Sequence, residues 1–494
     1  MDDHRKRFRE WDAMDGRQEI VSPETVLPED DLVYFVLDTI PELELSAFYQ
    51  YYSTDGRGQP PFRVEMMATL LVYAYCVGVF SSRKIAAACE RNLAFLAIVG
   101  NQRPDFRTIN DFRKHHAAAM RPLFIEVLRL AGKLGMVKLG NLSTDGTKIE
   151  ANASRHKAMS FGYMTKELQR LEQEIDQLLA EADRVDAEQD AALGSRRGDE
   201  LPDELKRREE RMAKIREAKG RLETEARARA EEEQCRRDAD QAARAAAGKK
   251  RRGKEPTPVD PTPEAKAQTN FTDADAKIMK RSNKGFDYCY NAQATVDREH
   301  QIIVAAEVTA AANDKQQAVP LATAAVANLD AAGIERPRDA EGQPLPIPNT
   351  ADSGYYSEAG VQGVTAAGLD PYFAVGRDKH HSPAVPESSR VESTNCVEST
   401  DCVKSTNCVE STSTAESTEV NPKVAMAQKL RTPIGRALYA ARKHIVEPVF
   451  GQIKHLRGFR KFSLRGLELV SAEWQLICLT HNLLKIWRHS ASVG

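Results

Sequence analysis

Three acidic residues, far apart in the sequence, have the types and settings that phosphodiester chemistry requires. Asp145 lies in "LSTDGTKIE", where alternating apolar residues predict a β-strand, and Asp352 ends a second short strand in "NTADSGYY". Glu447 lies in a basic helical segment, next to Pro448, which predicts a kink there. Moving a phosphodiester needs an activated hydroxyl and a stabilised leaving oxygen, and two Mg²⁺ ions held by a few carboxylates supply both. A single Asp-Gly is more often a turn, so the assignment depends on the fold bringing the three acids together.

The order of the predicted elements indicates how that happens. Without two insertions, the segments after residue 136 follow one another as strand, strand, strand, helix, strand, helix, strand and helix. The second and third strands, "DYCYNAQATVD" and "QIIVAAEVTA", are joined by a tight polar turn, and Pro320 strains the helix after them. This order predicts an α/β protein with a ribonuclease H-like mixed sheet flanked by helices. In that topology the first and fourth strands are neighbours, so Asp145 and Asp352 converge, and the last helix brings Glu447 to the same sheet edge.

Composition divides the chain into segments. We predict a helical N-terminal DNA-binding domain (1–135), a catalytic domain in two parts (136–160 and 270–380), an inserted coiled-coil helical hairpin (161–245), a basic, proline-rich linker (246–269), a disordered loop of hexapeptide repeats such as "VESTNC" (381–425) and basic helices that complete the catalytic domain (426–494). The hairpin is predicted from an a/d heptad pattern at Leu168, Leu171, Ile175, Leu178, Ala182 and Val185. A spacer and a specific binding surface are alternative roles for this arm.

Two helical segments in the N-terminal part are compatible with a helix-turn-helix. They are "SSRKIAAACERNLAFLAIVG" and "PDFRTINDFRKHHAAAMRPLFIEVLRLAGKLG", the second with Thr108 as its N-cap. Their polar faces carry candidate DNA-binding residues, namely Arg83, Lys84, Arg107, Arg113 and Lys114. Any helical bundle has a similar pattern, so a purely structural role remains the alternative.

The net charge of −2 conceals an asymmetry between two parts of the chain. Residues 421–494 contain thirteen Lys and Arg against three Glu, a local balance of +10, so the rest of the chain sums to −12. A segment this basic suggests contact with a polyanion, and a solvated helix face is the alternative. The N-terminus lacks the apolar region of a secretory signal, and the longest apolar run, residues 66–80, is too short for a membrane helix of ~20 residues. We therefore predict a cytoplasmic protein without a membrane partner.

Several stretches are similar to one family. "DGTKIEANAS", "ADSGYYS" and "RKHIVEPVFGQIKHLRGFRKFSLRGL" resemble DDE-type bacterial insertion-sequence transposases of the eleven-eighty-two group, and the resemblance extends over residues 50–488. It implies that two Asp and one Glu hold divalent metal, and the motifs place them at Asp145, Asp352 and Glu447. From the apolar pattern of the C-terminal helix, His481 is predicted to be a core or capping residue, and Trp474 a core residue with stacking on an unpaired base as the alternative.

Relatives often carry a Tyr-Arg-Glu-Lys signature on the last helix, and this chain departs from it in part. Glu447 and Lys454 keep the family's spacing, whereas Lys443 stands at the Arg position with Arg442 beside it, and Tyr439 is displaced by one residue. Positions 443, 447 and 454 share one helical face, where cations would hold phosphates beside a metal ligand. Lys443, Lys454 and Arg442 are therefore candidate DNA contacts.

The resemblance implies a specific reaction. Such a protein binds the terminal inverted repeats of its own insertion sequence, cleaves there with Mg²⁺ (two ions, with Mn²⁺ as a substitute) and joins the freed 3′-OH to target DNA. Pairing of two ends implies a homodimer or larger assembly on double-stranded DNA. One alternative is another ribonuclease H-like metal-dependent nuclease, which cuts without joining. The other is an inactive DNA-binding relic, in which the repeat loop hinders assembly of the site.

Overall fold

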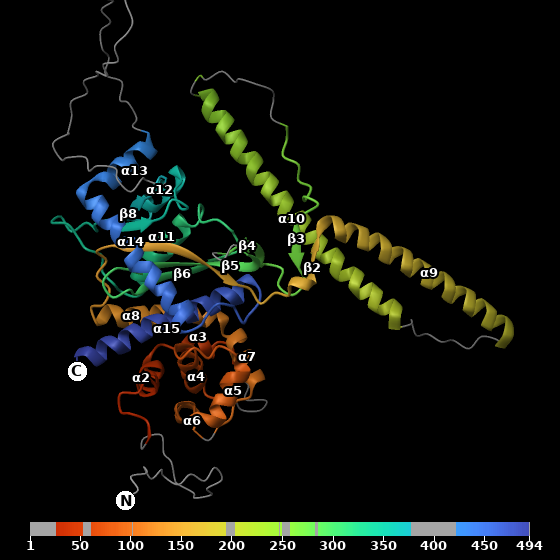
Figure 1. Cartoon of the computed structure of the whole chain (residues 1–494), viewed down its shortest axis with the longest axis horizontal. Coiled ribbons are helices and arrows are strands. Elements are labelled where there is room, and N and C mark those ends of the chain that lie inside the picture. Colours follow the sequence, from red (N-terminus) through yellow and green to blue (C-terminus); the bar gives the residue numbers. More distant parts are fainter. Residues whose placement is uncertain are drawn as a thin grey trace, which may run out of the picture.

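The structure, a computed structural model, describes residues 26–52, 61–100, 102–193, 203–246, 248, 257–281, 285–376 and 421–493. Figure 1 shows a helical N-terminal region, a mixed sheet with packed helices, and two long helices that project to one side. The predicted mixed α/β class is confirmed. Most of the predicted repeat loop and part of the predicted linker lie outside the described residues. No helix in the described part of the chain is long and apolar enough to cross a membrane.

The central sheet places the two aspartates side by side. Its strands are β1 (Leu142–Glu150), β4 (Lys277–Lys280), β5 (Phe286–Asp297), β6 (Ile303–Thr309), β7 (Ile347–Ala351) and β8 (Leu369–Phe373). Their order is β4-β5-β1-β7-β8, and β6 also pairs with β5. β5 is antiparallel to its neighbours, whereas β1, β7 and β8 are parallel. The parallel register puts Ser143 beside Thr350, so continuing it by two residues brings Asp145 next to Asp352.

Helices cover this sheet and close its core. They are α11 (Ala318–Ala331), α12 (Glu358–Ala366), α13 (Pro422–Arg431), α14 (Pro433–Gly451) and α15 (Leu467–Val493). α14 packs along β1 and β7, α15 along β6, and α11 along β5 and β6. The strain expected at Pro320 is absent, because α11 begins at residue 318 and a proline in the first helical turn removes no intrahelical hydrogen bond. Trp474 and His481 of α15 are buried, as predicted.

A residue outside the helix that carries Glu447 supplies the hydrogen bond that its proline, Pro448, cannot make. α14 continues through Pro448 into a π-helical turn, Gln452–Leu456. Because proline has no N–H, it cannot donate to His444 O, and Gln301 Nε2 in the β5–β6 turn donates to that oxygen instead, at 3.0 Å. The backbone oxygen of Gln301 also accepts a hydrogen bond from His481 Nε2 at 3.0 Å. Burial lowers the pKa of His481 to about 3, so this imidazole is neutral.

The N-terminal helices are shorter than their sequence patterns predict. They are α2 (Leu32–Thr39), α3 (Ser46–Tyr49), α4 (Val64–Cys76), α5 (Ser82–Arg91), α6 (Leu93–Val99), α7 (Phe106–His115) and α8 (Met120–Lys133). The first predicted helix breaks at Asn92, whose side chain caps α6 by accepting from Ala94 N at 3.0 Å. Thr108 is not an N-cap, because Asp105 takes that role and accepts from Thr108 N at 2.7 Å. α4 is the buried helix predicted from the long apolar run.

Arg113 joins these helices to the C-terminal part, and the prediction that it lies on an exposed face is wrong. Its guanidinium donates to Tyr75 Oη at 2.7 Å and to Phe80 O at 3.0 Å. It also lies 3.8 Å from the carboxylate of Glu473 on α15, with side chains that are 5% and 0% exposed. Glu473 in turn accepts from the backbone N–H groups of residues 463 and 464. The N-terminal helices and the sheet consequently share one continuous hydrophobic core.

The projecting arm consists of α9 (Phe161–Leu193) and α10 (Asp203–Ala246) (Figure 1). Ion pairs between Arg208 and Glu174 at 3.1 Å and between Arg216 and Glu172 at 2.8 Å fix an antiparallel arrangement. A separate small hydrophobic cluster lies at its base, formed by Met164, Leu168, Leu171, Ile215, Ala218 and Leu222. There, a short unpredicted sheet of β2 (Ala158–Ser160) and β3 (Gln268–Asn270) connects the arm to the body. α10 continues past this base, so its second half does not pair with α9 (Figure 1).

Candidate active site

Asp145 is a partly buried carboxylate in the middle of β1. Its Oδ1 accepts from Gly146 N at 2.8 Å, and its Oδ2 accepts from Arg442 Nη1 at 3.2 Å. Burial raises the pKa of Asp145 to about 6, and the charges of Asp352 and Asp314 add to the rise, while the Gly146 N–H and Arg442 oppose it. A cation held here would relieve this repulsion between carboxylates.

A third carboxylate, Asp314, lies beside this pair and was not predicted. It is in the turn before α11, where Asn291 Nδ2 and Gln293 Nε2 each donate to its Oδ1 at 2.7 Å. A Cβ added to Gly354 would lie 3.0 Å from Asp352 Oδ1 and 3.7 Å from Asp314 Oδ2. Both carboxylates therefore approach the same point, from two separate segments of the chain.

Gly146 is required for close approach of side chains and forms no turn. β1 continues through it in extended pairing with Gln293 of β5. A Cβ at Gly146 would overlap Gln293 Nε2 and would lie 2.9 Å from Asp314 Oδ1. Because side chains alternate along a strand, Asp145 faces α14 while position 146 faces Asp314. The Asp-Gly pair thus combines a carboxylate on one face with a missing side chain on the other, where Gln293 and Asp314 take up the space.

Glu447 lies on α14, which runs along β1, and its side chain is exposed. Two hydrogen bonds fix how the helix and the strand run together. Ser143 Oγ donates to Arg442 O at 3.4 Å, and Lys454 Nζ donates to Lys148 O at 2.9 Å. Glu447 lies between these two points of contact along the helix.

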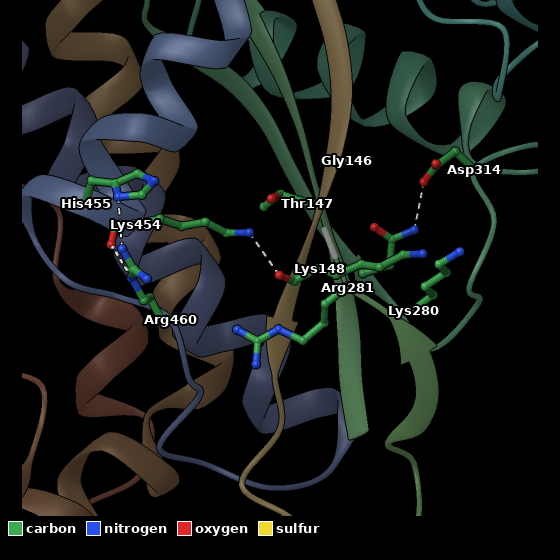
Figure 2. A pocket seen from close by; sticks show the side chains of 10 residues that line it. Gly146, Thr147, Lys148, Lys280, Arg281, Asp314, Lys454, His455 and Arg460 are labelled. Carbon is green, nitrogen blue, oxygen red and sulfur yellow. Dashed lines mark hydrogen bonds between the residues drawn. The ribbon is translucent and has the colours of Figure 1, made fainter. Parts of the chain in front are cut away.

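A cavity of about 520 Å³, which we call the basic pocket, opens next to Gly146 (Figure 2). It is lined by Gly146, Thr147, Lys148, Lys280, Arg281, Asn291, Asp314, Lys454, His455 and Arg460. Asp314 lies at one side, and Lys454 extends across the pocket toward β1 (Figure 2). Burial, together with the positive charges of Arg281 and Arg460, lowers the pKa of Lys454 to about 8.

The other predicted DNA-binding residues are scattered. Lys443, Lys84 and Lys114 are exposed, whereas the side chain of Arg442 is 10% exposed and pairs with Asp145. Two further arginines lie close to the Phe106 ring, with the guanidinium carbons of Arg83 and Arg107 at 5.0 Å and 5.7 Å from its centroid. This places two exposed cations and an aromatic ring together where α5 meets α7.

The acidic residues fit a hard divalent cation by their chemistry. Among the residues that the structure describes, no three His, Cys, Asp or Glu side chains are arranged as ligands of a metal ion. Asp145, Asp352 and Asp314 nevertheless come from three segments, repel one another and offer the oxygen ligands that Mg²⁺ prefers. Their carboxylate chemistry suits a hard cation, while in the part of the chain that the structure describes the three side chains are not arranged as a ligand set.

Sequence analysis missed Asp314 and most of the basic pocket. The sequence pattern predicts that a helix already begins in the polar stretch "NDKQQ" after β6, although its turn residues mark a break before α11. Lys280 and Arg281 follow "KIM" at the end of β4, a strand too short to show periodicity. In both places, the sequence shows only charged residues beside the end of a strand. Many exposed loops have the same feature, so it does not identify a site.

Two family models match the chain. One, described as Transposase domain (DUF772), matches residues 21–115, and the other, described as Transposase DDE domain, matches residues 373–487. The second match includes Glu447 and Lys454, while Asp145 and Asp352 precede it. No curated protein and no solved structure matches the chain.

Proposed function

Because this chain is a DDE transposase of the insertion-sequence type, as both matches support, we propose that it cleaves DNA at the terminal inverted repeats of its own element. The freed 3′-OH ends would then attack target DNA. The observation that carries this proposal is the β1–β7 register, which, continued by two residues to just past the end of β7, brings Asp352 beside Asp145. The sheet order β6-β5-β1-β7-β8 supports our assignment of the catalytic part to the ribonuclease H-like fold.

We assign divalent metal, Mg²⁺ or Mn²⁺, to Asp145 and Asp352, with Glu447 as the third acid of the family pattern. When bound, two such ions would activate the attacking oxygen and stabilise the leaving oxygen. Asp314 is close enough to Asp352 to act as a further ligand or to orient one. Arg442 holds the carboxylate of Asp145 in place.

DNA is the proposed partner. Because the two ends of the insertion sequence must be paired, at least a homodimer is expected on the DNA. The exposed Arg83 and Arg107 beside Phe106 support a DNA-contacting surface on the N-terminal helices. Cationic side chains bind phosphates, and an aromatic ring can stack on a base. Lys443 and Lys454 on the α14 segment are proposed to hold phosphates near the acids.

The proposal is tested with purified full-length protein, DNA carrying the ends that flank its gene, and a supercoiled target plasmid. With Mg²⁺, joined products should form with the wild type and disappear with Asp352→Asn and with Glu447→Gln. Asp330→Asn, at an exposed acid on α11, should keep full activity.

Each alternative has its own outcome in this assay. Cutting without joining would favour a nuclease on the same fold. End binding without cleavage by the wild type would identify a DNA-binding relic.

A further inference from the structure

The basic pocket holds more positive charge than neighbouring acids balance. Arg281 has acidic partners, Glu150 at 3.3 Å and Asp287 at 3.1 Å. Among the ion pairs of the described residues, none involves Lys148, Lys280, Lys454 or Arg460; ion pairs of nearby cations, such as that of Lys461 with Glu150, lie outside the pocket. Within the described part of the chain, four cations without a carboxylate partner thus line one concave site.

These four cations come from three separate segments of the chain. Lys148 lies on β1, Lys280 ends β4, and Lys454 and Arg460 flank the loop after α14. Backbone contacts hold the last two in place, because Lys454 Nζ donates to Lys148 O at 2.9 Å and Arg460 Nε donates to Lys454 O at 3.1 Å. Figure 2 shows Lys454 and Arg460 on one side of the β1 ribbon and Lys280 on the other, with Lys454 reaching toward Lys148. The clustering is therefore a product of the tertiary fold.

The lining indicates the kind of ligand. None of the described residues that line the pocket is Phe, Tyr or Trp, and the one imidazole among them, that of His455, contacts Arg460 Nη2 through its Nδ1 at 2.9 Å. Cationic side chains, rather than rings on which bases stack, therefore dominate the lining. Lysine and arginine side chains suit phosphate oxygens, which they bind without regard to base sequence. A cavity of about 520 Å³ is in the size range of small-molecule sites, far smaller than a double helix requires. Its ligand is a short piece of phosphate-bearing chain.

We propose that the basic pocket binds backbone phosphates of a single DNA strand at the point where it leaves the acidic site. This inference rests on the proposed function, because the pocket begins at Gly146 and Asp314, directly beside Asp145 and Asp352. The strand would pass from the carboxylates along β1 toward Arg460. The pocket fixes the direction of the strand and does not read its sequence.

The test measures binding without cleavage. Full-length wild type, the double variant Lys280→Ala/Arg460→Ala and the control Lys133→Ala, at an exposed lysine outside the pocket, are titrated in EDTA against fluorescent DNA ends with a single-stranded extension. Neutral methylphosphonates replace single phosphates, one position at a time, across the end. Removing the cation that holds one phosphate should lower the slope of log K against log salt by about 0.7.

We expect the double variant to lower this slope by about 1.4, the sum for two cations. The wild type should lose affinity when one or two adjacent phosphates of one strand are neutralised. The double variant should not lose affinity at those same positions, because the partners of these phosphates are already missing.

Equal salt slopes for the double variant and Lys133→Ala would overturn the proposal. So would a double variant that loses as much affinity as the wild type when the same phosphates are neutralised. Cleavage of the same DNA by the wild type with Mg²⁺ is measured in parallel. If that cleavage fails while the pocket effect appears, the proposed function is wrong and the phosphate site stands. If cleavage occurs without the pocket effect, only the pocket assignment falls.

Discussion

Gly146 shows how a residue without a side chain can define a site. Gln293 and Asp314 occupy the space that a Cβ would fill, so Gly146→Ala must displace both. We expect at least a tenfold loss of cleavage with end binding intact, because sub-ångström displacement of reacting groups is costly. The control is Gly451→Ala at the end of α14, where a Cβ meets nothing within 4 Å and helix propensity favours alanine by about 1 kcal/mol. Equal activity of both variants would show that the space around Gly146 is not needed.

Asp314 is the acid that sequence analysis overlooked, and its role can be separated from folding. Asp314→Asn keeps the size of the side chain but removes its charge next to Asp352. We expect cleavage to fall about 10–100-fold, the usual cost of losing a supporting group of a metal site. Binding of Mn²⁺, followed by calorimetry without DNA, should weaken as well. Glu358→Gln, at an exposed acid on α12, should change neither quantity.

Asp145 makes stability depend on pH in an unusual direction for an acid. Its native pKa of about 6 is above the unfolded value of 3.8, so the native state binds more protons between these values. The contribution of Asp145 to the free energy of unfolding is therefore most favourable at low pH and is lost as the pH rises through about 6. The loss is roughly 1–1.5 kcal/mol between pH 5 and pH 8. Urea unfolding should measure this loss in the wild type and not in Asp145→Asn. The stability of the variant relative to the wild type should therefore rise by this amount from pH 5 to pH 8. Parallel pH profiles for the two proteins would contradict it.

At the scale of elements, the contact between α7 and α15 depends on one buried ion pair. Arg113→Ala leaves Glu473 charged and buried, with Tyr75 as its remaining side-chain partner. We expect a loss of about 3–5 kcal/mol in the free energy of unfolding, the usual cost of breaking such a pair. Lys114→Ala, at the exposed neighbouring residue, should stay within about 0.5 kcal/mol. A small effect of Arg113→Ala on denaturant unfolding would mean that the pair contributes no stability.

Element order and strand neighbours were predictable from sequence, whereas the partners of single side chains were not. Apolar alternation around Asp145 marks a strand and Asp352 ends a second one, and the ribonuclease H-like element order predicted from the chain makes those two strands neighbours. Arg113 was assigned to an exposed face although it follows the buried Ile109 by four residues, a spacing that puts both on the same helical face. Asp314 could not be assigned, because its position depends on amide groups from β5, which is distant in sequence.

At the scale of the whole molecule, the arm and the body have separate hydrophobic clusters. Leu171, 1% exposed, belongs to the arm, and Leu70, 0% exposed, belongs to the body. Leu171→Ala should cost about 2–5 kcal/mol in local stability, and this loss should be confined to the arm. Hydrogen exchange measured by mass spectrometry should show faster exchange in α9 and α10 alone, whereas Leu70→Ala should affect the sheet and the N-terminal helices. Uniform acceleration by Leu171→Ala would show that arm and body unfold together.

The proline beside Glu447 makes one helix dependent on a distant turn. His444 O has no donor from position 448 of α14, and the amide of Gln301, 143 residues earlier, supplies the replacement. Gln301 itself holds a backbone conformation with φ 58°, which few residues other than glycine and asparagine adopt easily. The β5–β6 hairpin therefore adds a third contact that positions α14, besides those that join the α14 segment to Ser143 and Lys148 of β1. Under the proposed function, a change in this turn would alter cleavage although Gln301 is not among the residues assigned to metal or DNA.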